Sequence, residues 1–506
     1  MNVSVISLTN THESTKKEGT ILFALLLLMA ARVSFPLATG THGASAQEVL
    51  TDVLRVPQDF ATIQEAVNAA DPCATIWVAT GTYFESIIVD KDHLTIIGED
   101  KHTTILDGNE SRTPVKIAGN NITVQGFTIQ KSGSMRPSLL IEHAQGCNIE
   151  GNILSDNREY CLLISNSSDN TVTNNVITRN REYGVKLLNS HGNTLTNNTI
   201  LDNAVYGIQL EAADRNTIRE NAIEASSWDN IFLWQSNNNI VAENTLRNGE
   251  WDGIRLAFSD NNTITKNLIE NNTWDGIRIR ESENNIITHN MIANNLGYGI
   301  RFYNSNHTAI YLNSFINTHQ IILAESYENE WTNLNLNFGN YWSDYAGEDA
   351  DNDGIGDSSY VVSREDHDIF PLMGPINTFD TSTWNDELQV YLISNSTISG
   401  FNIDTTPKTL SFNVTGIDST MGFCRMNIPN IIIQDLWQGN FSVLVNGQTT
   451  TFQKWTDATY TCIYFTYALS EHKVTIIPEF QLTTILLVAI AHTTSLFIVK
   501  KRRKSF

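Results

Sequence analysis

The chain of 506 residues is 41% hydrophobic and contains only 10 prolines, which is ordinary for a folded protein with more than one domain. Its formal net charge of -23 makes the surface a poor partner for nucleic acid, so we exclude nucleic-acid binding. The five cysteines are scattered and form no C-x-x-C motif, so they predict neither a disulfide framework nor a zinc module, although Cys424 and Cys462 could pair.

The first 46 residues have the features of a secretory signal. Lys16 and Lys17 precede an apolar run at residues 21–30, and Ala44-Ser-Ala46 then offers the small residues of a cleavage site. We therefore expect residues 1–46 to be removed and the rest of the chain to be exported.

The segment after the signal combines irregular strand-like runs with one short helix. Thr62-Ile-Gln-Glu65 is a capping box that leads into an alanine-rich stretch, and Asp71-Pro72 ends it. We expect this helix to cover the open end of the repeat structure that follows. The run from Phe60 to Glu85 resembles the opening of pectate-lyase-like and pectin-esterase-like β-helix proteins.

Asparagine recurs every 23 residues through the middle of the chain. Such a period predicts a solenoid, and a carboxamide can donate and accept, so it can bond to its equivalent one coil away. The main column contains Asn152, Asn175, Asn198, Asn221, Asn244, Asn267, Asn290 and Asn313, and a second column contains Asn170, Asn193, Asn216, Asn239, Asn262 and Asn285.

A second strand in each repeat begins at a glycine column of the same register. Asn230 occupies the one position in this column where glycine is missing. Aliphatic residues follow with period-2 alternation, as at Ile254 and Leu256, and helix-period spacing is absent. The pattern predicts an all-β fold, a right-handed parallel β-helix with 23-residue coils, over residues 47–375.

Three further columns in the later coils form the candidate ligand site. Rings beside charged groups favour binding of a glycan chain along the axis, whereas the same ladders also stabilise coils, so both interpretations stay open. The aspartates are also candidate catalytic acids, because glycoside hydrolysis needs two carboxylates about 5 to 9.5 Å apart. The columns are Trp228, Trp251 and Trp274; Asp229, Asp252 and Asp275; and Arg255, Arg278 and Arg301.

Three motifs follow the repeats in a fixed order: Gly339-Asn-Tyr-Trp-Ser-Asp-Tyr345, an aspartate-rich loop at 349–357, and Asp368-Ile-Phe-Pro-Leu-Met373. Together with the repeats they resemble the NosD-like β-helix family over residues 54–375. The resemblance implies a β-helix of the carbohydrate-binding and sugar-hydrolysis type, secreted or surface-bound and common in archaea as an anchored module. It also implies copper delivery, which the dispersed histidines and methionines do not favour.

The aspartate-rich loop predicts a calcium site. Asp349, Asp351, Asp353 and Asp357 have the spacing of calcium-loop carboxylates, with glycine at the sharp turn, while Tyr360 stands where an EF-hand has glutamate. We expect calcium to hold the last coil closed, and no organic cofactor. The alternative is a solvated acidic turn.

In the C-terminal part the 23-residue repeat stops, and an apolar run follows near the end. Residues 376–478 have short alternating strands and an Asn446-Gly447 hairpin signal, which predicts a membrane-proximal β-sandwich. Residues 480–499 are long and apolar enough for a transmembrane helix, and residues 500–506 form a basic cytoplasmic tail. N-x-S/T sequons at Asn395, Asn413 and Asn440 agree with an exterior location.

Two functions of different classes follow from these patterns. The first is a membrane-anchored cell-surface β-helix protein that binds or organises carbohydrate, either a polysaccharide or a cell-surface glycan, without chemistry. The second is an extracellular polysaccharide hydrolase or lyase, for which no convincing set of catalytic residues stands out. Copper delivery of the NosD type is a third and weaker interpretation.

Overall fold

The computed structural model describes residues 53–384 and 388–479, which form a parallel β-solenoid followed by small antiparallel sheets. The predicted signal at 1–46, the predicted transmembrane helix at 480–499 and the basic tail at 500–506 lie outside the described residues. Within the described ranges, no helix is both long and apolar enough to cross a membrane.

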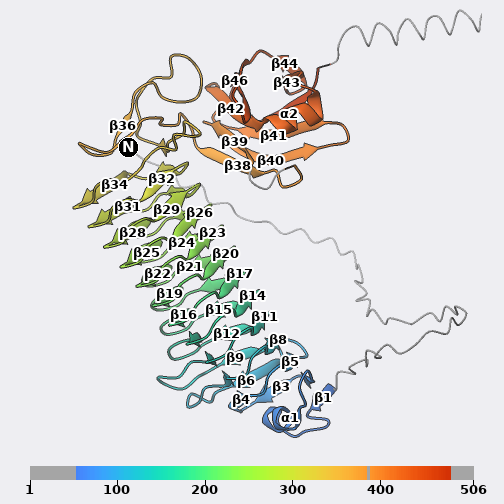
Figure 1. The fold of residues 1–506 in the computed structure, drawn as a ribbon. Helices are drawn as coiled ribbons and strands as arrows, with labels where there is room; N and C mark the ends of the chain where they lie inside the picture. The colour runs from blue at the N-terminus through green and yellow to red at the C-terminus, as the bar shows by residue number, and fades with distance from the viewer. Residues whose placement is uncertain (1–52, 385–387, 480–506) are drawn as a thin grey trace, which may run out of the picture. The chain divides into compact units, whose positions relative to one another are not determined.

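The predicted parallel solenoid is confirmed, since coil after coil contributes one short strand to each of three parallel sheets. Figure 1 shows these strands stacked in register along the solenoid. The first sheet consists of β1 Val53–Val56, β2 Thr75–Val78, β5 Thr95–Gly98, β8 Thr123–Gln125, β11 Asn148–Glu150, β14 Thr171–Thr173, β17 Thr194–Thr196, β20 Thr217–Arg219, β23 Ile240–Ala242, β26 Thr263–Thr265, β29 Ile286–Thr288 and β32 Ala309–Tyr311.

The other two sheets complete each coil. One consists of β4 Ile87–Val89, β7 Val115–Ile117, β10 Leu139–Glu142, β13 Leu162–Ser165, β16 Val185–Leu188, β19 Ile208–Glu211, β22 Ile231–Trp234, β25 Ile254–Ala257, β28 Ile277–Arg280, β31 Tyr298–Tyr303 and β34 His319–Ala324. The other consists of β3 Gly81–Tyr83, β6 Thr104–Asp107, β9 Thr128–Gln130, β12 Ile153–Ser155, β15 Val176–Thr178, β18 Thr199–Leu201, β21 Ala222–Glu224, β24 Thr245–Arg247, β27 Leu268–Glu270, β30 Met291–Ala293, β33 Ser314–Ile316 and β35 Tyr341–Trp342.

The core of the solenoid is a continuous stack of aliphatic side chains. Most strands of the first and third sheets bury one inward aliphatic residue, such as Ile218 and Ile223, and most strands of the second sheet bury two, such as Ile208 and Leu210. Burial of these side chains is the main favourable term for the fold.

Asparagine ladders close the corners between the strands, as the sequence predicts. In each rung the side-chain oxygen accepts the backbone N–H of the asparagine one coil earlier, and the side-chain nitrogen usually donates to the next oxygen. Asn340 extends the main column beyond Asn313. These bonds satisfy polar backbone groups that the coil buries.

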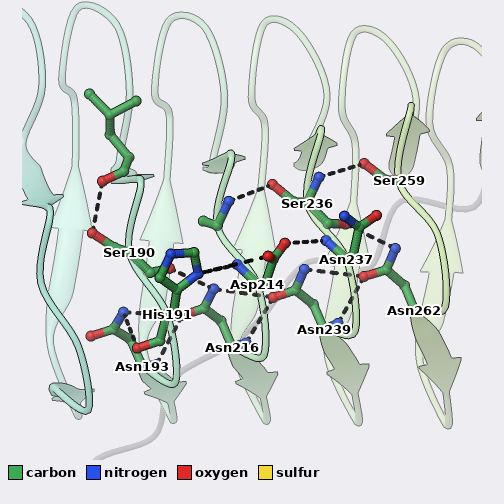
Figure 2. Close-up of polar contacts among 12 residues, drawn as sticks. Ser190, His191, Asn193, Asp214, Asn216, Ser236, Asn237, Asn239, Ser259 and Asn262 are labelled. Atoms are coloured by element: carbon green, nitrogen blue, oxygen red, sulfur yellow. Dashed lines mark hydrogen bonds and ion pairs between the residues drawn. The ribbon is translucent and has the colours of Figure 1, made fainter.

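Three more ladders are present that the sequence pattern did not predict. Figure 2 shows a serine ladder, in which the N–H of Ser236 donates to the hydroxyl of Ser259, beside the asparagines and an outer column at the same corner. In that outer column His191 Nδ1 accepts the N–H of Asp214 at 3.0 Å. A third asparagine ladder contains Asn157, Asn180 and Asn203, then Asn272, Asn295 and Asn317.

The third ladder is interrupted at Ser226 and Gly249, and Asn230 compensates for the gap. Its side chain fills the space beside Gly249 and donates to Asn272 Oδ1 at 3.0 Å. In a neighbouring coil, a Cβ at Gly207 would lie 2.4 Å from Cγ2 of Ile223, whereas the equivalent of that isoleucine for Asn230 is Leu246, which lacks a Cγ2 atom. Asn230, which replaces a glycine of the glycine column, therefore supplies the side-chain amide that the third asparagine ladder lacks at Gly249.

We expect Asn230→Gly and Gly249→Asn each to destabilise the protein by about 1–3 kcal/mol, because the first leaves a void and unpaired polar groups and the second overpacks. The double variant should lose less than the sum, since it recreates the regular arrangement of the other coils. Urea unfolding of the four proteins measures this coupling. Additive losses would contradict the compensation.

The predicted capping helix is present as α1 Ile63–Ala69, with both bonds of the Thr62 and Glu65 capping box. Its Gln64 side chain accepts the N–H of Ile88 at 2.7 Å and donates to the carbonyl of the same residue at 3.2 Å. Ile88 lies in β4, the end strand of its sheet. The amide of Gln64 thus occupies the place of a further strand on an edge that would otherwise pair with another chain.

The region after the solenoid begins with β36 Tyr360–Val361 and β37 His367–Asp368 and continues with two five-stranded antiparallel sheets, which share one hydrophobic core. The sheets contain β38 Ile376–Asp380, β39 Gln389–Ser394, β42 Met421–Pro429, β45 Gln453–Thr456 and β46 Tyr460–Ala468, and β40 Thr397–Asp404, β41 Thr409–Thr415, β43 Phe441–Val445, β44 Gln448–Thr450 and β47 His472–Pro478.

This region contains the predicted hairpin, a helix that was not predicted and two cysteines that are not paired. The Asn446-Gly447 hairpin joins β43 and β44, with positive φ at both residues, as predicted. A helix, α2 Asn430–Trp437, was not predicted. The suggested pairing of Cys424 with Cys462 is wrong, because both are free, buried thiols facing other residues across the β42 and β46 pair.

Candidate functional site

The predicted tryptophan, aspartate and arginine columns meet on one wall of the solenoid. Each tryptophan and the aspartate after it lie in the turn that leads into β22, β25 or β28. Arg255, Arg278 and Arg301 occupy matching positions in β25, β28 and β31. Consecutive members of each column are one coil apart, about 4.8 Å.

The three tryptophans form a continuous stack. The ring centroids of Trp228 and Trp251 are 5.3 Å apart with planes at 11°, and those of Trp251 and Trp274 are 5.3 Å apart at 9°. The edge of Tyr206 meets Trp228 at one end. At the other end the column continues with Gly297, which has no side chain to cover Trp274. Trp228 and Trp274, at the two ends of the stack, are 42% and 44% exposed, whereas Trp251 between them is half-buried.

The three aspartates are fully buried, with 0% exposure. Their column continues a tyrosine column, because Tyr206 precedes Asp229 and Tyr298 follows Asp275 by 23 residues. Oδ1 of Asp229 accepts the N–H of Asp252 at 3.1 Å, and Oδ1 of Asp252 accepts the N–H of Asp275 at 3.0 Å. They therefore act as rungs between coils, as the asparagines do.

Arginines of the following coil face these carboxylates. Arg255 lies 3.8 Å from Asp229, and the Arg301 guanidinium binds both oxygens of Asp275. Burial, reinforced by the neighbouring carboxylate, raises the pKa of Asp229 to about 8 and that of Asp252 to about 6. The Oδ2 atoms of both residues are buried without a hydrogen-bond partner among the described residues.

A raised carboxyl pKa is suited to a general acid, but position matters first. A catalytic carboxyl must reach the glycosidic oxygen, and none of these three side chains has exposed surface in this conformation. The geometry thus favours a structural role for the candidate catalytic residues Asp229, Asp252 and Asp275.

The arginines are the accessible charged groups of this wall. The side chains of Arg255, Arg278 and Arg301 are 18%, 26% and 28% exposed. Aromatic rings support two of them, since Arg255 lies 5.0 Å from the centroid of Phe232 and Arg301 lies 4.8 Å from that of Tyr298. The ladder of guanidiniums is therefore held in place and partly open to a ligand.

A cavity of about 360 Å³ adjoins the arginine column, lined in part by Arg278, Arg280, Arg301, Tyr303 and Ala324. Arg280 and Tyr303 were not predicted as site residues. The 23-residue register places them in one column, but that column changes residue type at every coil, so no repeated pattern marked it.

Arg280 lies between two exposed aromatic rings. Its guanidinium carbon is 5.9 Å from the centroid of Phe258 and 5.8 Å from that of Tyr303, which are 43% and 44% exposed. Trp274 is 44% exposed as well. The wall thus combines open aromatic surface with guanidinium donors.

The aspartate loop brings three of its four predicted residues together. Oxygens of Asp349, Asp351 and Asp353 all lie within 4.8 Å of one another, whereas Asp357 is outside this group and accepts the N–H of Ala350. The Arg425 guanidinium binds Asp353 at 2.9 Å. Burial raises the pKa of Asp349, although N–H groups of the loop oppose this shift.

The family model described as "Periplasmic copper-binding protein (NosD)" matches residues 78–250 and 225–347, more than half of the chain. The chain belongs to the NosD family. The NosD match covers the coils that carry the three columns and the motif at Gly339–Tyr345, and it stops before the aspartate loop. None of the curated proteins matches this NosD-family chain significantly.

Solved structures similar to this NosD-family protein share its fold at low identity. The A-module of mannuronan C-5 epimerase AlgE6 from Azotobacter vinelandii is 13% identical, covering 53% of this chain and 91% of that one, with a TM-score of 0.44. An alginate lyase from Paenibacillus sp. str. FPU-7 is 15% identical, covering 55% and 99%, with a TM-score of 0.39. These similarities are too distant to carry an argument about activity.

Proposed function

We propose that this NosD-family protein binds carbohydrate on the wall formed by β22, β25, β28 and β31, without catalysing a reaction on it. The observation that carries the proposal is the set of exposed rings, Phe258, Trp274 and Tyr303, that surround partly exposed guanidiniums on neighbouring coils. Ring faces and hydrogen-bond donors that follow the spacing between successive coils suit a sugar chain that lies along the solenoid.

Binding is favoured over hydrolysis because the acidic residues of this wall are covered. Asp229, Asp252 and Asp275 have no exposed surface, and their Oδ1 atoms are committed to backbone N–H groups. A polysaccharide hydrolase or lyase remains the second candidate, supported by the raised pKa of Asp229, which is typical of a proton donor.

Copper delivery receives no support from the residues that the structure describes. Within them, the single group of three or more His, Cys, Asp or Glu side chains close enough to share a metal is Asp349, Asp351 and Asp353. Its ligands are all carboxylate oxygens, whereas copper prefers nitrogen and sulfur ligands. The family description alone does not assign this role to the chain.

We also propose that the protein is exported by residues 1–46 and anchored at the cell surface by residues 480–499. The apolar run and the basic tail at 500–506 support this placement. Fractionation of cells that express the full chain, or a form ending at residue 479, would test it. Membrane recovery of the full chain and release of the shorter form is expected, and equal release of both would overturn the anchor.

The binding proposal is tested with the full-length chain and a panel of neutral and acidic polysaccharides. Trp274→Ala and Tyr303→Ala should each weaken binding about tenfold, because each removes an open ring from the wall. Phe84→Ala is the matched control, since this ring is 61% exposed but belongs to an early coil. Absence of binding to every polysaccharide, or an equal loss with Phe84→Ala, would reject the proposal.

Assays for products on the same panel separate the two candidate functions. No release of reducing or unsaturated ends is expected. Turnover that disappears in an Asp229→Asn, Asp252→Asn, Asp275→Asn variant with unchanged folding would establish the enzyme instead.

Calcium at the aspartate loop is a further proposal, with Asp349, Asp351 and Asp353 as ligands. Added Ca²⁺ should raise the thermal unfolding temperature by a few degrees and EDTA should reverse the rise, because a ligand of the folded state stabilises it. Asp349→Asn should abolish the effect, while Asp357→Asn should weaken it less, since Asp357 lies outside the group. An unchanged unfolding temperature would favour the solvated acidic turn.

A further inference from the structure

We propose that the carbohydrate bound at this wall carries an anionic group on successive sugar units, which Arg255, Arg278 and Arg301 bind in consecutive coils with Arg280 beside them. This inference rests on the proposed binding function and specifies the class of ligand.

The first observation is the distribution of charge. The chain contains 55 acidic and only 32 basic residues, yet four arginines gather on three neighbouring strands, β25, β28 and β31. The carboxylates that face the arginine column are the buried aspartates, and Glu281 pairs with Arg280 from the side. These ion pairs thus combine four partly exposed guanidiniums with one partly exposed carboxylate, that of Glu281, so an anionic ligand is favoured over a neutral one.

The second observation is that two of these guanidiniums have spare donors. Arg278 comes no closer than 3.9 Å to Asp252, and Arg255 no closer than 3.8 Å to Asp229, so neither contact is a hydrogen bond. A guanidinium has five N–H donors in a planar fork that matches a carboxylate or sulfate.

The third observation is the spacing of the donors along the axis. Arg255 pairs with Arg278 and Arg278 with Arg301 in the strand register, so their attachment points repeat at the coil rise of about 4.8 Å. This rise is close to the length of one sugar unit in an extended polysaccharide. The adjoining cavity of about 360 Å³ beside Tyr303 has room for a sugar ring against an aromatic face.

Matched pairs of polymers test the inference with the full-length protein. Polygalacturonate and its fully methyl-esterified form share one backbone and differ in the carboxylate, while dextran sulfate and dextran differ in the sulfate. We expect at least about tenfold tighter binding of the anionic member of one pair, a preference that decreases as salt is added. The pair that shows the preference identifies the anionic group.

Three variants locate the preference on the wall. Arg278→Gln and Arg280→Gln should each reduce the preference for the anionic polymer about tenfold, because each removes a charged donor. Arg278→Lys should recover only part of it, since a lysine keeps the charge without the planar fork. Arg219→Gln is the matched control, a half-exposed arginine of β20 in the first sheet, and should leave binding unchanged.

The outcomes separate this inference from the proposed function. Equal binding of charged and neutral partners, with no effect of Arg278→Gln, would overturn the anionic class and leave carbohydrate binding intact. A preference unaffected by Arg278→Gln and Arg280→Gln would overturn the assignment to this wall. Equal affinity for a short DNA duplex would show a general response to polyanions and also overturn it. No binding to any polymer would reject both proposals.

Discussion

Asn221→Ala is expected to lower the free energy of unfolding by more than about 3 kcal/mol, because one side chain joins three coils. Its Nδ2 donates to the carbonyl of Leu195 at 2.9 Å and to Asn244 Oδ1 at 3.0 Å, while its Oδ1 accepts the N–H of Asn198 at 3.0 Å. Alanine removes the acceptor of the buried Asn198 N–H and one donor to the Leu195 carbonyl, while Asn244 Oδ1 keeps only the backbone N–H of residue 221. Urea unfolding followed by circular dichroism measures the loss.

Thr217→Ser provides the control for this prediction. Thr217 lies in the neighbouring strand β20 and points outward, so its loss of one methyl group should change stability by less than about 0.5 kcal/mol. A loss for Asn221→Ala no larger than that of the control would show that the ladder is dispensable.

Asp229→Asn is expected to stabilise the protein at pH 8 by about 1–4 kcal/mol and to have little effect at pH 4. Burial and the neighbouring Asp252 raise the pKa of Asp229 to about 8 in the folded protein, far above its usual value of about 3.9. Between these values the folded state holds the proton and the unfolded state does not. Stability therefore falls as pH rises through this window, and asparagine removes the loss while keeping the oxygen that accepts the Asp252 N–H.

Urea unfolding at pH 4, 6 and 8 measures this prediction as the difference between variant and parent. Asp107→Asn is the control of opposite sign. Burial alone would raise the pKa of Asp107, but hydrogen bonds from Gln130 and Lys131 lower it below the usual value. The Asp107 carboxylate therefore stabilises the fold at neutral pH and stabilises it less in acid. A variant Asp229→Asn that is weaker than the parent at pH 8 would mean that Asp229 is ionised and stabilised by Arg255.

The architecture was predictable because the solenoid repeats one chemical requirement in every coil. A rung must lie next to its equivalent in the following coil, so the main asparagine column keeps its register through eight positions. The third ladder obeys the same physics but is broken at Ser226 and Gly249, and its repair by Asn230 comes from another column. Repetition of one residue type at one spacing does not predict a hydrogen bond between two different columns.

The candidate site was only partly predictable for a related reason. Period-2 alternation indicates which side of a strand a residue is on, but neighbouring side chains decide how much of it remains exposed. Asp229 belongs to a turn column that its tyrosine neighbours share, and its side chain is completely buried, 3.8 Å from Arg255. Helix α2 was missed because Ile431, Ile432 and Ile433 favour a strand locally, whereas packing of Leu436 and Trp437 into the second core favours the helix.

Because each rung bonds only to the coils directly before and after it, a genetic duplication or deletion of 23 codons would leave most of the ladders intact. Coil number can therefore change between generations at small cost where the coils are plain. The exception is the stretch from Ser226 to Asn272, where Asn230 and Gly249 depend on each other across a coil boundary. An insertion there would separate the two residues. The number of coils in the segment that begins the arginine wall is therefore constrained, whereas the number of plain coils elsewhere can change.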